Sequence, residues 1–252
     1  MKYFYSLFFL ALSLSGYAAA PNDIGGSQRG WYDAVDINAN GDYTDNPADN
    51  MAISLWVDKS GAGNSLSQNG TRRPLYDLNN LSTGRHGLVF DGVDDALEDA
   101  NDIWTGAVSS SESFVVATTE SAQNSWLFAS TDTGTNRLSA HVPWGNGSTY
   151  FDQGICCGNP TRLSGSIPIS FFQQYIWHFI GLPDMQGVLQ DAKLQLSDSG
   201  ASTYNVTTNS SFALGGVPIR VGHSHDGSYF EAIFYQTALN DAQRSILNSY
   251  LS

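Results

Sequence analysis

The polar run DINANGDYTDN, which begins at residue 36, has the residue types and spacing of a calcium loop. Its first half, D-x-N-x-N-G-D, follows the start of an EF-hand-like loop, where side-chain oxygens at positions one, three and five bind the ion. Gly41 permits the sharp turn that such a loop needs. The sequence therefore predicts a calcium site that pins the N-terminal segment. The predicted ligands are Asp36, Asn38, Asn40, Asp42 (through its backbone carbonyl) and Asp45.

This loop also departs from the EF-hand. Its twelfth position holds Pro47 in place of Glu, so Asp45 or Asp49 would have to supply the last carboxylate. No helices are predicted on either side of the loop. The alternative is a surface loop rich in Asx turns, in which Asp and Asn side chains bond nearby backbone amides.

An aromatic and polar segment around PWGNGSTYFD could bind a sugar. Aromatic rings pack against the apolar faces of sugars, and Asn or Asp side chains bind the hydroxyls. Trp144 is the most suggestive aromatic residue, because it lies among turn residues. Trp126, Phe151 and Tyr175 are further candidates near loops, although most aromatic residues of a β domain lie in its core. The predicted ligand-binding residues are Trp144, Asn146, Tyr150 and Asp152.

Cys156 and Cys157 are the only two cysteines of the chain, and they are neighbours. In an oxidising compartment they would form a vicinal disulfide, which stiffens the loop from residue 154 to residue 158. Two reduced thiols or a bridge to another molecule are the alternatives. A C-x-x-C redox motif is absent, which disfavours a disulfide-exchange enzyme.

Other polar residues give weaker indications of chemistry. His223 and His225 would share one face of a strand, but a third metal ligand beyond Asp226 is not evident. Glycoside hydrolysis needs two placed carboxylates. The four glutamates do not form the E-x-D-x-x-E strand of jelly-roll glucan hydrolases, and nothing singles out a pair of aspartates.

The start of the chain predicts export. Lys2, the apolar run from Leu7 to Leu14 and the small residues up to Ala20 are typical of a secretory signal peptide. The run is short for a membrane span, and no later stretch is apolar enough for one. We therefore expect residues 1–20 to be a signal peptide, 21–30 a flexible lead-in and 31–252 one domain. The mature protein would be secreted, periplasmic or at the cell surface, without membrane insertion.

The formal net charge of −13 limits the partners. Nucleic acid and anionic membranes attract basic surfaces, so neither is an expected partner. The charge suits calcium, a neutral glycan or a cationic partner, and solubility alone would also explain it.

Short apolar or alternating runs, separated by NG, DG, GG and NP pairs, predict many strands and a sandwich or jelly roll. One C-terminal helix is predicted, with Asn240 and Gln243 as its capping box. Ile246, Leu247, Tyr250 and Leu251 would form its apolar face. The predicted strands are Ala52–Val57, Gly87–Phe90, Ser113–Thr119, Trp126–Ser130, Leu138–Val142, Thr149–Asp152, Trp177–Leu182, Ala192–Leu196, Tyr204–Thr208, Pro218–Gly222 and Glu231–Tyr235.

Two motifs resemble a known family. The segment LWVDKSGAGNSLSQ…RRPLYD…GLVFDGVDDALE, together with YFEAIFYQTALNDAQRSILNSYL at the C-terminal end, is similar to the bacterial laminin-G-like, concanavalin A-like jelly-roll domains. The resemblance implies an all-β, two-sheet antiparallel sandwich with a short C-terminal helix, and it assigns Glu231 a role in the fold. In the first motif, Asp58, Ser60 and Asn64 are expected to tie a glycine-rich turn, as Asp94 and Asp95 do in the second.

The fold hosts lectins, adhesion modules and some enzymes, so it does not fix the function. We expect a non-catalytic secreted or surface binding module, stabilised by calcium if the Asp36 loop binds the ion, whose ligand is a glycan or a surface protein. The alternatives are a structural or adhesive subunit of a pilus or another extracellular assembly, and a polysaccharide-active hydrolase or lyase.

Overall fold

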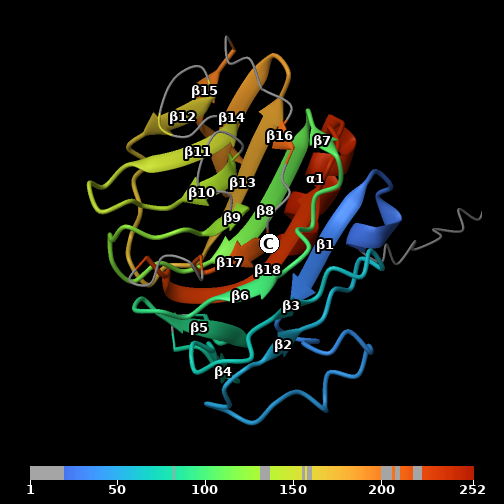
Figure 1. Ribbon diagram of the computed structural model, residues 1–252, viewed down its shortest axis with the longest axis vertical. Helices are drawn as coiled ribbons and strands as arrows, with labels where there is room; N and C mark the ends of the chain where they lie inside the picture. Colours follow the sequence, from blue (N-terminus) through green and yellow to red (C-terminus); the bar gives the residue numbers. More distant parts are fainter. Residues whose placement is uncertain are drawn as a thin grey trace, which may run out of the picture.

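The computed structural model describes residues 20–81, 83–130, 137–154, 157, 161–199, 206–207, 211–217 and 223–252. Two antiparallel β-sheets are stacked face to face, and one helix lies near the C-terminal end (Figure 1). The predicted all-β sandwich with a short C-terminal helix is therefore confirmed. Within these residues, no helix is long and apolar enough to cross a bilayer.

Sheet A has the order β15-β14-β13-β8-β18-β5-β4, and β1 pairs with the second half of β18. The long strand β18 thus carries β5 along its first half and β1 along its second half. The strands are β1 (Gln28–Asp33), β4 (Leu75–Asp77), β5 (Gly87–Asp91), β8 (Ser111–Ala117), β13 (Tyr175–Leu182), β14 (Met185–Gln190), β15 (Lys193–Asp198) and β18 (Asp226–Tyr235).

Sheet B has the order β12-β11-β10-β9-β17-β6-β3-β2. Its strands are β2 (Leu55–Trp56), β3 (Leu66–Ser67), β6 (Leu97–Asp99), β9 (Phe128–Ser130), β10 (Arg137–His141), β11 (Thr149–Gly154), β12 (Arg162–Gly165) and β17 (Phe212–Leu214). A two-stranded ribbon, β7 (Ala107–Val108) with β16 (Val206–Thr207), completes the strands.

Side chains alternate between the two faces of each strand, and this alternation builds the core. In β8, Val115 and Ala117 belong to the cluster between the sheets, whereas Phe114 and Val116 belong to a second cluster on the outer face of sheet A. Because both faces of sheet A are covered, β8 is buried along its whole length.

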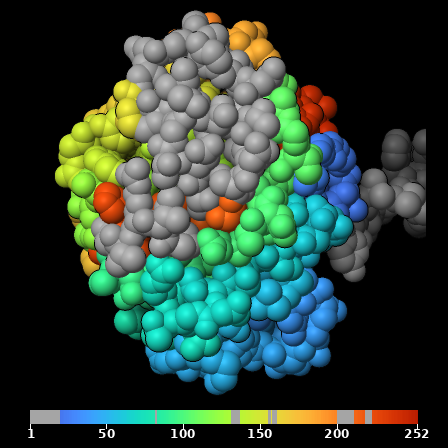
Figure 2. All heavy atoms as spheres, in the orientation of Figure 1, coloured from blue at the N-terminus to red at the C-terminus, as the bar shows by residue number. Residues whose placement is uncertain are grey.

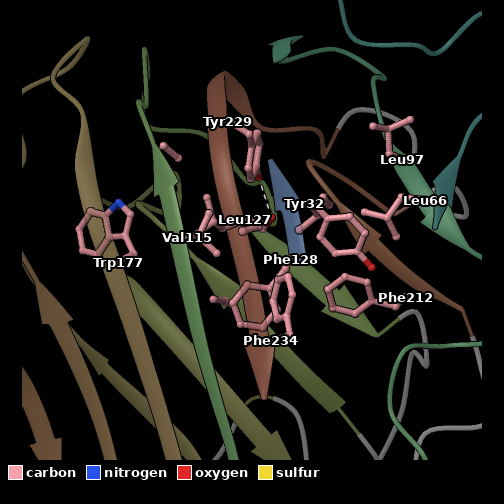
Figure 3. Packing of buried hydrophobic residues seen from close by; sticks show 14 of the residues in the cluster. Tyr32, Leu66, Leu97, Val115, Leu127, Phe128, Trp177, Phe212, Tyr229 and Phe234 are labelled. Carbon is pink, nitrogen blue, oxygen red and sulfur yellow. Dashed lines mark hydrogen bonds between the residues drawn. The ribbon is translucent and has the colours of Figure 1, made fainter. Parts of the chain in front are cut away.

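Aromatic rings fill the space between the sheets (Figure 3). The Phe234 ring of sheet A lies 5.4 Å from the Phe128 ring and 5.0 Å from the Phe212 ring of sheet B, both edge to face. The Tyr229 hydroxyl donates a 2.7 Å hydrogen bond to the Leu127 carbonyl. Such aromatic pairs stabilise beyond the area that they bury, so these rings hold the two sheets together.

Helix α1 (Asp241–Leu251) covers the outer face of sheet A. The predicted capping box is confirmed, since Asn240 accepts from the Gln243 amide and Gln243 accepts from the Asn240 amide. Leu247 and Leu251 are buried as predicted, but Ile246 is 39% exposed. The face of the helix that packs on the sheet is therefore narrower than the sequence pattern predicts.

The N-terminal segment is more ordered than the expected lead-in at 21–30. Residues Pro21–Asp23 form a 3-10 turn, and β1 begins at Gln28. The pairing of β1 with β18 at the C-terminal end of the chain organises this segment, which local composition could not indicate. The predicted strand Pro218–Gly222, and all of Tyr204–Thr208 except residues 206–207, lie outside the described residues.

The first turn motif ties the backbone as expected, and the second does so through Asp95 and Asp91 rather than through Asp94. The Asp58 carboxylate accepts hydrogen bonds from the backbone amides of Trp31, Ser60 and Asn64. In the second motif, Asp95 accepts from the Asp91 amide at 3.1 Å. These acidic residues therefore serve the fold.

Candidate functional site: an aromatic platform on the outer face of sheet B

The hairpin turn between β10 and β11 places Trp144 just beyond the ends of these two strands. The Trp144 amide donates to the Ser148 carbonyl at 2.8 Å, and the Gly147 amide donates to the Trp144 carbonyl at 2.7 Å. Gly147 has a φ of 80°, in the left-handed region that glycine adopts readily. This turn holds the indole beside the outer face of the sheet.

Five rings form what we call the aromatic platform: Trp126, His141, Trp144, Tyr150 and His223. The Trp144 ring lies 6.1 Å from Trp126, 4.8 Å from His141 and 5.9 Å from His223, measured between centroids. Tyr150 lies 6.2 Å from His141, edge to face. Trp126 and His141 are buried, whereas Trp144 and Tyr150 are partly exposed. The platform thus presents Trp144 and Tyr150 to the outside.

Asn146 adds an exposed amide at the rim of the platform. Its Nδ2 donates to the Tyr150 hydroxyl at 2.7 Å, and its Oδ1 accepts from the Ser148 amide at 3.0 Å. The predicted residues Trp144, Asn146 and Tyr150 therefore lie together at one surface. A partly exposed indole, a phenol and an amide are groups that bind sugars.

Asp152, the fourth predicted ligand-binding residue, lies beneath this surface. It is fully buried and accepts two hydrogen bonds from Arg162, of 2.6 and 2.7 Å. Burial opposes its ionisation, but the hydrogen bonds from Arg162 and the positive charges of Arg162 and Arg137 outweigh it and lower the pKa of Asp152 to about 2. The carboxylate is therefore ionised and positions the arginine.

Arg162 in turn supports Tyr150. Its guanidinium carbon lies 4.6 Å from the centre of the Tyr150 ring. A cation over an aromatic face is attracted by the quadrupole of the ring. Asp152, Arg162 and Tyr150 therefore stack in order from the interior to the surface.

Arg137 supports the other side of the platform. Its guanidinium lies 5.5 Å from the Trp126 ring, and it bonds Ser139 Oγ at 2.8 Å and His141 Nε2 at 3.2 Å. His141 Nδ1 lies 2.7 Å from the Ser125 carbonyl oxygen. Burial lowers the pKa of His141, so this ring is neutral and accepts from the arginine. The network leaves the buried rings in fixed orientations.

Sequence reasoning did not single out Arg137, His141 or Arg162 for this site. The sequence does contain a pattern that predicts this network. Residues 137, 139 and 141 alternate along β10, which places three polar side chains on one face of the strand. The pairing of Asp152 with both Ser139 and Arg162 across the sheet follows from register, which one strand alone does not specify.

In the predicted calcium loop, Asp and Asn side chains hydrogen-bond to other groups of the same loop. Asp36 is buried and accepts from the backbone amides of Asn40 and Gly41. The Asp45 carboxylate accepts from the Nδ2 groups of Asn38 (3.0 Å) and Asn40 (2.7 Å). Bonds of this kind belong to the Asx-turn alternative.

A lysine already pairs with the buried acid of this loop. Lys59 Nζ lies 2.9 Å from Asp36 Oδ2 and 2.8 Å from Asp33 Oδ2. Asp42 binds the Thr44 amide and hydroxyl through its side chain, and these hydrogen bonds lower its pKa. A calcium ion would have to displace the ammonium and turn both asparagine amides, so calcium at Asp36, Asn38, Asn40, Asp42 and Asp45 stays a prediction.

Two further predictions concern the neighbouring cysteines and the pair of histidines. Cys157 is a described residue with a φ of 74°, and Cys156 lies outside the described residues, so the vicinal disulfide stays a prediction. The His225 ring is buried with Nε2 2.8 Å from the Thr118 carbonyl, while His223 contacts Trp126. The two histidines therefore face different surroundings.

Other buried acids have structural partners. Glu112 binds His178 at 2.8 Å and Arg244 at 2.7 Å, which ties α1 to sheet A. Among the described residues, a group of three carboxylates within 4.8 Å is formed by Asp91, Asp94 and Asp95, in the turn discussed above.

Comparison with known proteins finds similar folds but does not assign the chain to a family. No family model matches the chain, and no curated protein matches it. The laminin-G family is therefore not confirmed. The receptor-binding domain of botulinum neurotoxin D is similar in structure, with a TM-score of 0.58 and 14% identity over 92% of this chain and 54% of that chain.

Further similar structures are carbohydrate-related. An arabinofuranosidase complexed with arabinofuranosyl-α-1,2-xylobiose has a TM-score of 0.56 and 13% identity over 79% of this chain and 50% of that chain. Domain 4 of AbnA, an extracellular arabinanase from Geobacillus stearothermophilus, in complex with arabinotriose, has a TM-score of 0.51 and 16% identity over 81% of this chain and 99% of that domain. The chain spans about a third of the length of the Trypanosoma rangeli sialidases that it also matches.

Proposed function

We propose that this protein is an exported, non-catalytic carbohydrate-binding module whose aromatic platform is the binding surface. The observation that carries the proposal is the joint exposure of Trp144, Asn146 and Tyr150 on a rigid base. Because the Asp152, Arg162 and Arg137 network fixes the supporting rings, little conformational freedom is lost when a sugar binds.

The charge state of the platform favours binding over catalysis. Glycoside hydrolysis requires a pair of carboxyl groups, one of which keeps a proton near neutral pH. The carboxyl group under the platform, Asp152, has a lowered pKa and is held by Arg162. It cannot act as a general acid while it is paired in this way.

The fold comparisons support the choice of ligand class and of the first probes. Similar folds occur in an arabinofuranosidase and in domain 4 of an arabinanase, and the latter is in complex with arabinotriose. Arabino-oligosaccharides and xylo-oligosaccharides are therefore the first soluble probes, followed by a glycan array in the presence and absence of calcium.

The test compares Trp144→Ala with Tyr43→Ala. Both changes remove a ring with solvent exposure, but Tyr43 lies in the Asp36 loop outside the platform. We expect Trp144→Ala to raise the Kd for the best glycan at least tenfold, about 1.4 kcal/mol, and Tyr43→Ala to leave it unchanged. Isothermal titration calorimetry measures both.

Three outcomes would contradict the proposal. Release of new reducing ends from a polysaccharide would show an enzyme. Concentration-dependent self-assembly without glycan binding would support a structural or adhesive subunit. Saturable binding to a surface protein that Trp144→Ala does not weaken would place the binding surface elsewhere.

A further inference from the structure

A pocket of about 460 Å³ lies on the opposite side of the molecule from the aromatic platform. It opens between the C-terminal end of α1, the start of β13 and the turn that joins β14 to β15. Its volume is in the range of small-ligand sites. The lining residues are Gln174, Ile176, Asp191, Ala192, Asn248, Ser249 and Ser252.

Two oxygens in the wall of this pocket lack hydrogen-bond partners. Gln174 Oε1 and Asn248 Oδ1 are both shielded from solvent and unpaired. The Asn248 Nδ2 donates to the Arg244 carbonyl at 2.9 Å, which leaves Oδ1 as the unpaired acceptor of that amide. Buried polar groups are nearly always satisfied, so these two neighbouring acceptors are available to a donor.

The turn beside these oxygens supplies a third acceptor. Asp191 Oδ1 accepts from the Ile176 amide at 2.9 Å, which fixes the carboxylate at the pocket. Asp191 and Ala192 have φ values of 49° and 62°, although neither is glycine. They are the two central residues of the hairpin turn between β14 and β15, and a type I′ turn has positive φ at both positions.

The electrostatics of the pocket favour a cation. Of the seven lining residues, one is an acid and none is Lys, Arg or His. The C-terminal end of a helix carries partial negative charge on its carbonyl groups. The whole protein is acidic, which favours the approach of a cation.

We propose that this pocket binds a small primary amine in its ammonium form. An ammonium group has three N–H donors, and the pocket offers the three acceptors of Gln174, Asn248 and Asp191. Slight rotation of the two amide side chains turns their oxygens from the wall to the ligand. The carbon skeleton of the amine packs on Ile176 and Ala192.

The test uses matched pairs of free ligands. Glucosamine and glucose differ at one position, where an ammonium replaces a hydroxyl, and 1-aminopentane and 1-pentanol form the corresponding linear pair. We expect each amine to bind at least ten times more tightly than its neutral analogue. The pair with the larger difference identifies an amino sugar or a linear amine as the ligand type. Chemical-shift titration by NMR measures all four.

Two variants test the residues. Asp191→Asn keeps the oxygen that accepts from Ile176 and tolerates the left-handed backbone, but removes the charge. Gln174→Met keeps the length of the side chain and removes the amide. We expect each to weaken amine binding at least tenfold, with a melting temperature close to that of the wild type.

The aromatic platform provides the control. Asn146→Ala should leave amine binding unchanged, and Asp191→Asn should leave glycan binding unchanged, so failure of one site is distinguishable from failure of the other. Equal binding of amines and neutral analogues overturns the proposal. Amine binding that persists in both pocket variants also overturns it.

Discussion

At the scale of single residues, Glu231 shows how burial changes acidity without making a catalytic site. It is 3% exposed on the outer face of sheet A and accepts a 2.7 Å hydrogen bond from Trp31 Nε1. Burial, followed by the nearby Asp33 carboxylate, raises the pKa of Glu231 to about 7. Its location under α1 agrees with the fold role that the family resemblance implied.

This raised pKa makes stability depend on pH. The unfolded chain ionises Glu231 near its ordinary value, 4.5, while the folded protein keeps the proton up to about 7. The folded state therefore loses stability as the pH rises from about 4.5 to 7, by about 3 kcal/mol. We expect Glu231→Gln to remove this loss and to raise the melting temperature at pH 8. Thermal unfolding between pH 4 and pH 8 measures the effect.

Asp184→Asn is the matched control, because it makes the same change of charge at an exposed turn. Its pH profile should follow that of the wild type. A Glu231→Gln profile parallel to the wild type would show that Glu231 does not titrate in this window.

At the scale of elements, the sequence predicts a strand where the strand is long enough to show its own apolar pattern. The long strands β8, β13 and β18 have apolar runs that the sequence displays. The two-residue strands β3 and β7 have no such signal, because partners distant in the sequence define them. The same distinction applies to the site. Trp144, Asn146 and Tyr150 meet because one hairpin carries them, whereas Arg162 reaches Asp152 only through the register of β11 and β12.

The Asp36 loop is the element whose chemistry is easiest to test. The calcium hypothesis predicts that a chelator lowers the melting temperature of protein prepared with calcium, since an ion that binds only the folded state stabilises it. It also predicts that Asp45→Asn removes this shift. Differential scanning fluorimetry with and without EDTA measures both effects. An unchanged melting temperature would leave Lys59 as the cation that pairs with Asp33 and Asp36.

At the scale of the whole molecule, aromatic packing between the sheets carries much of the stability. Phe234 is fully buried against Phe128 and Phe212. We expect Phe234→Ala to reduce the free energy of unfolding by about 3–5 kcal/mol, because it removes apolar contact and leaves a cavity. Urea denaturation measures the change.

The same substitution at the surface is the control. Phe171 is 45% exposed, and Phe171→Ala should change the free energy of unfolding by less than about 1 kcal/mol. Similar losses from both variants would mean that the rings between the sheets do not dominate stability.

The two sheets end differently at opposite sides of the molecule. At one side, β12 and β15 approach each other, and Leu196 packs on Gly165. At the other side, the outermost strands β4 and β2 have three and two residues, in the lower part of the molecule (Figures 1 and 2). Strands this short offer few free backbone groups to a neighbouring copy. Edge-to-edge pairing with a neighbouring copy is therefore disfavoured at β4 and β2.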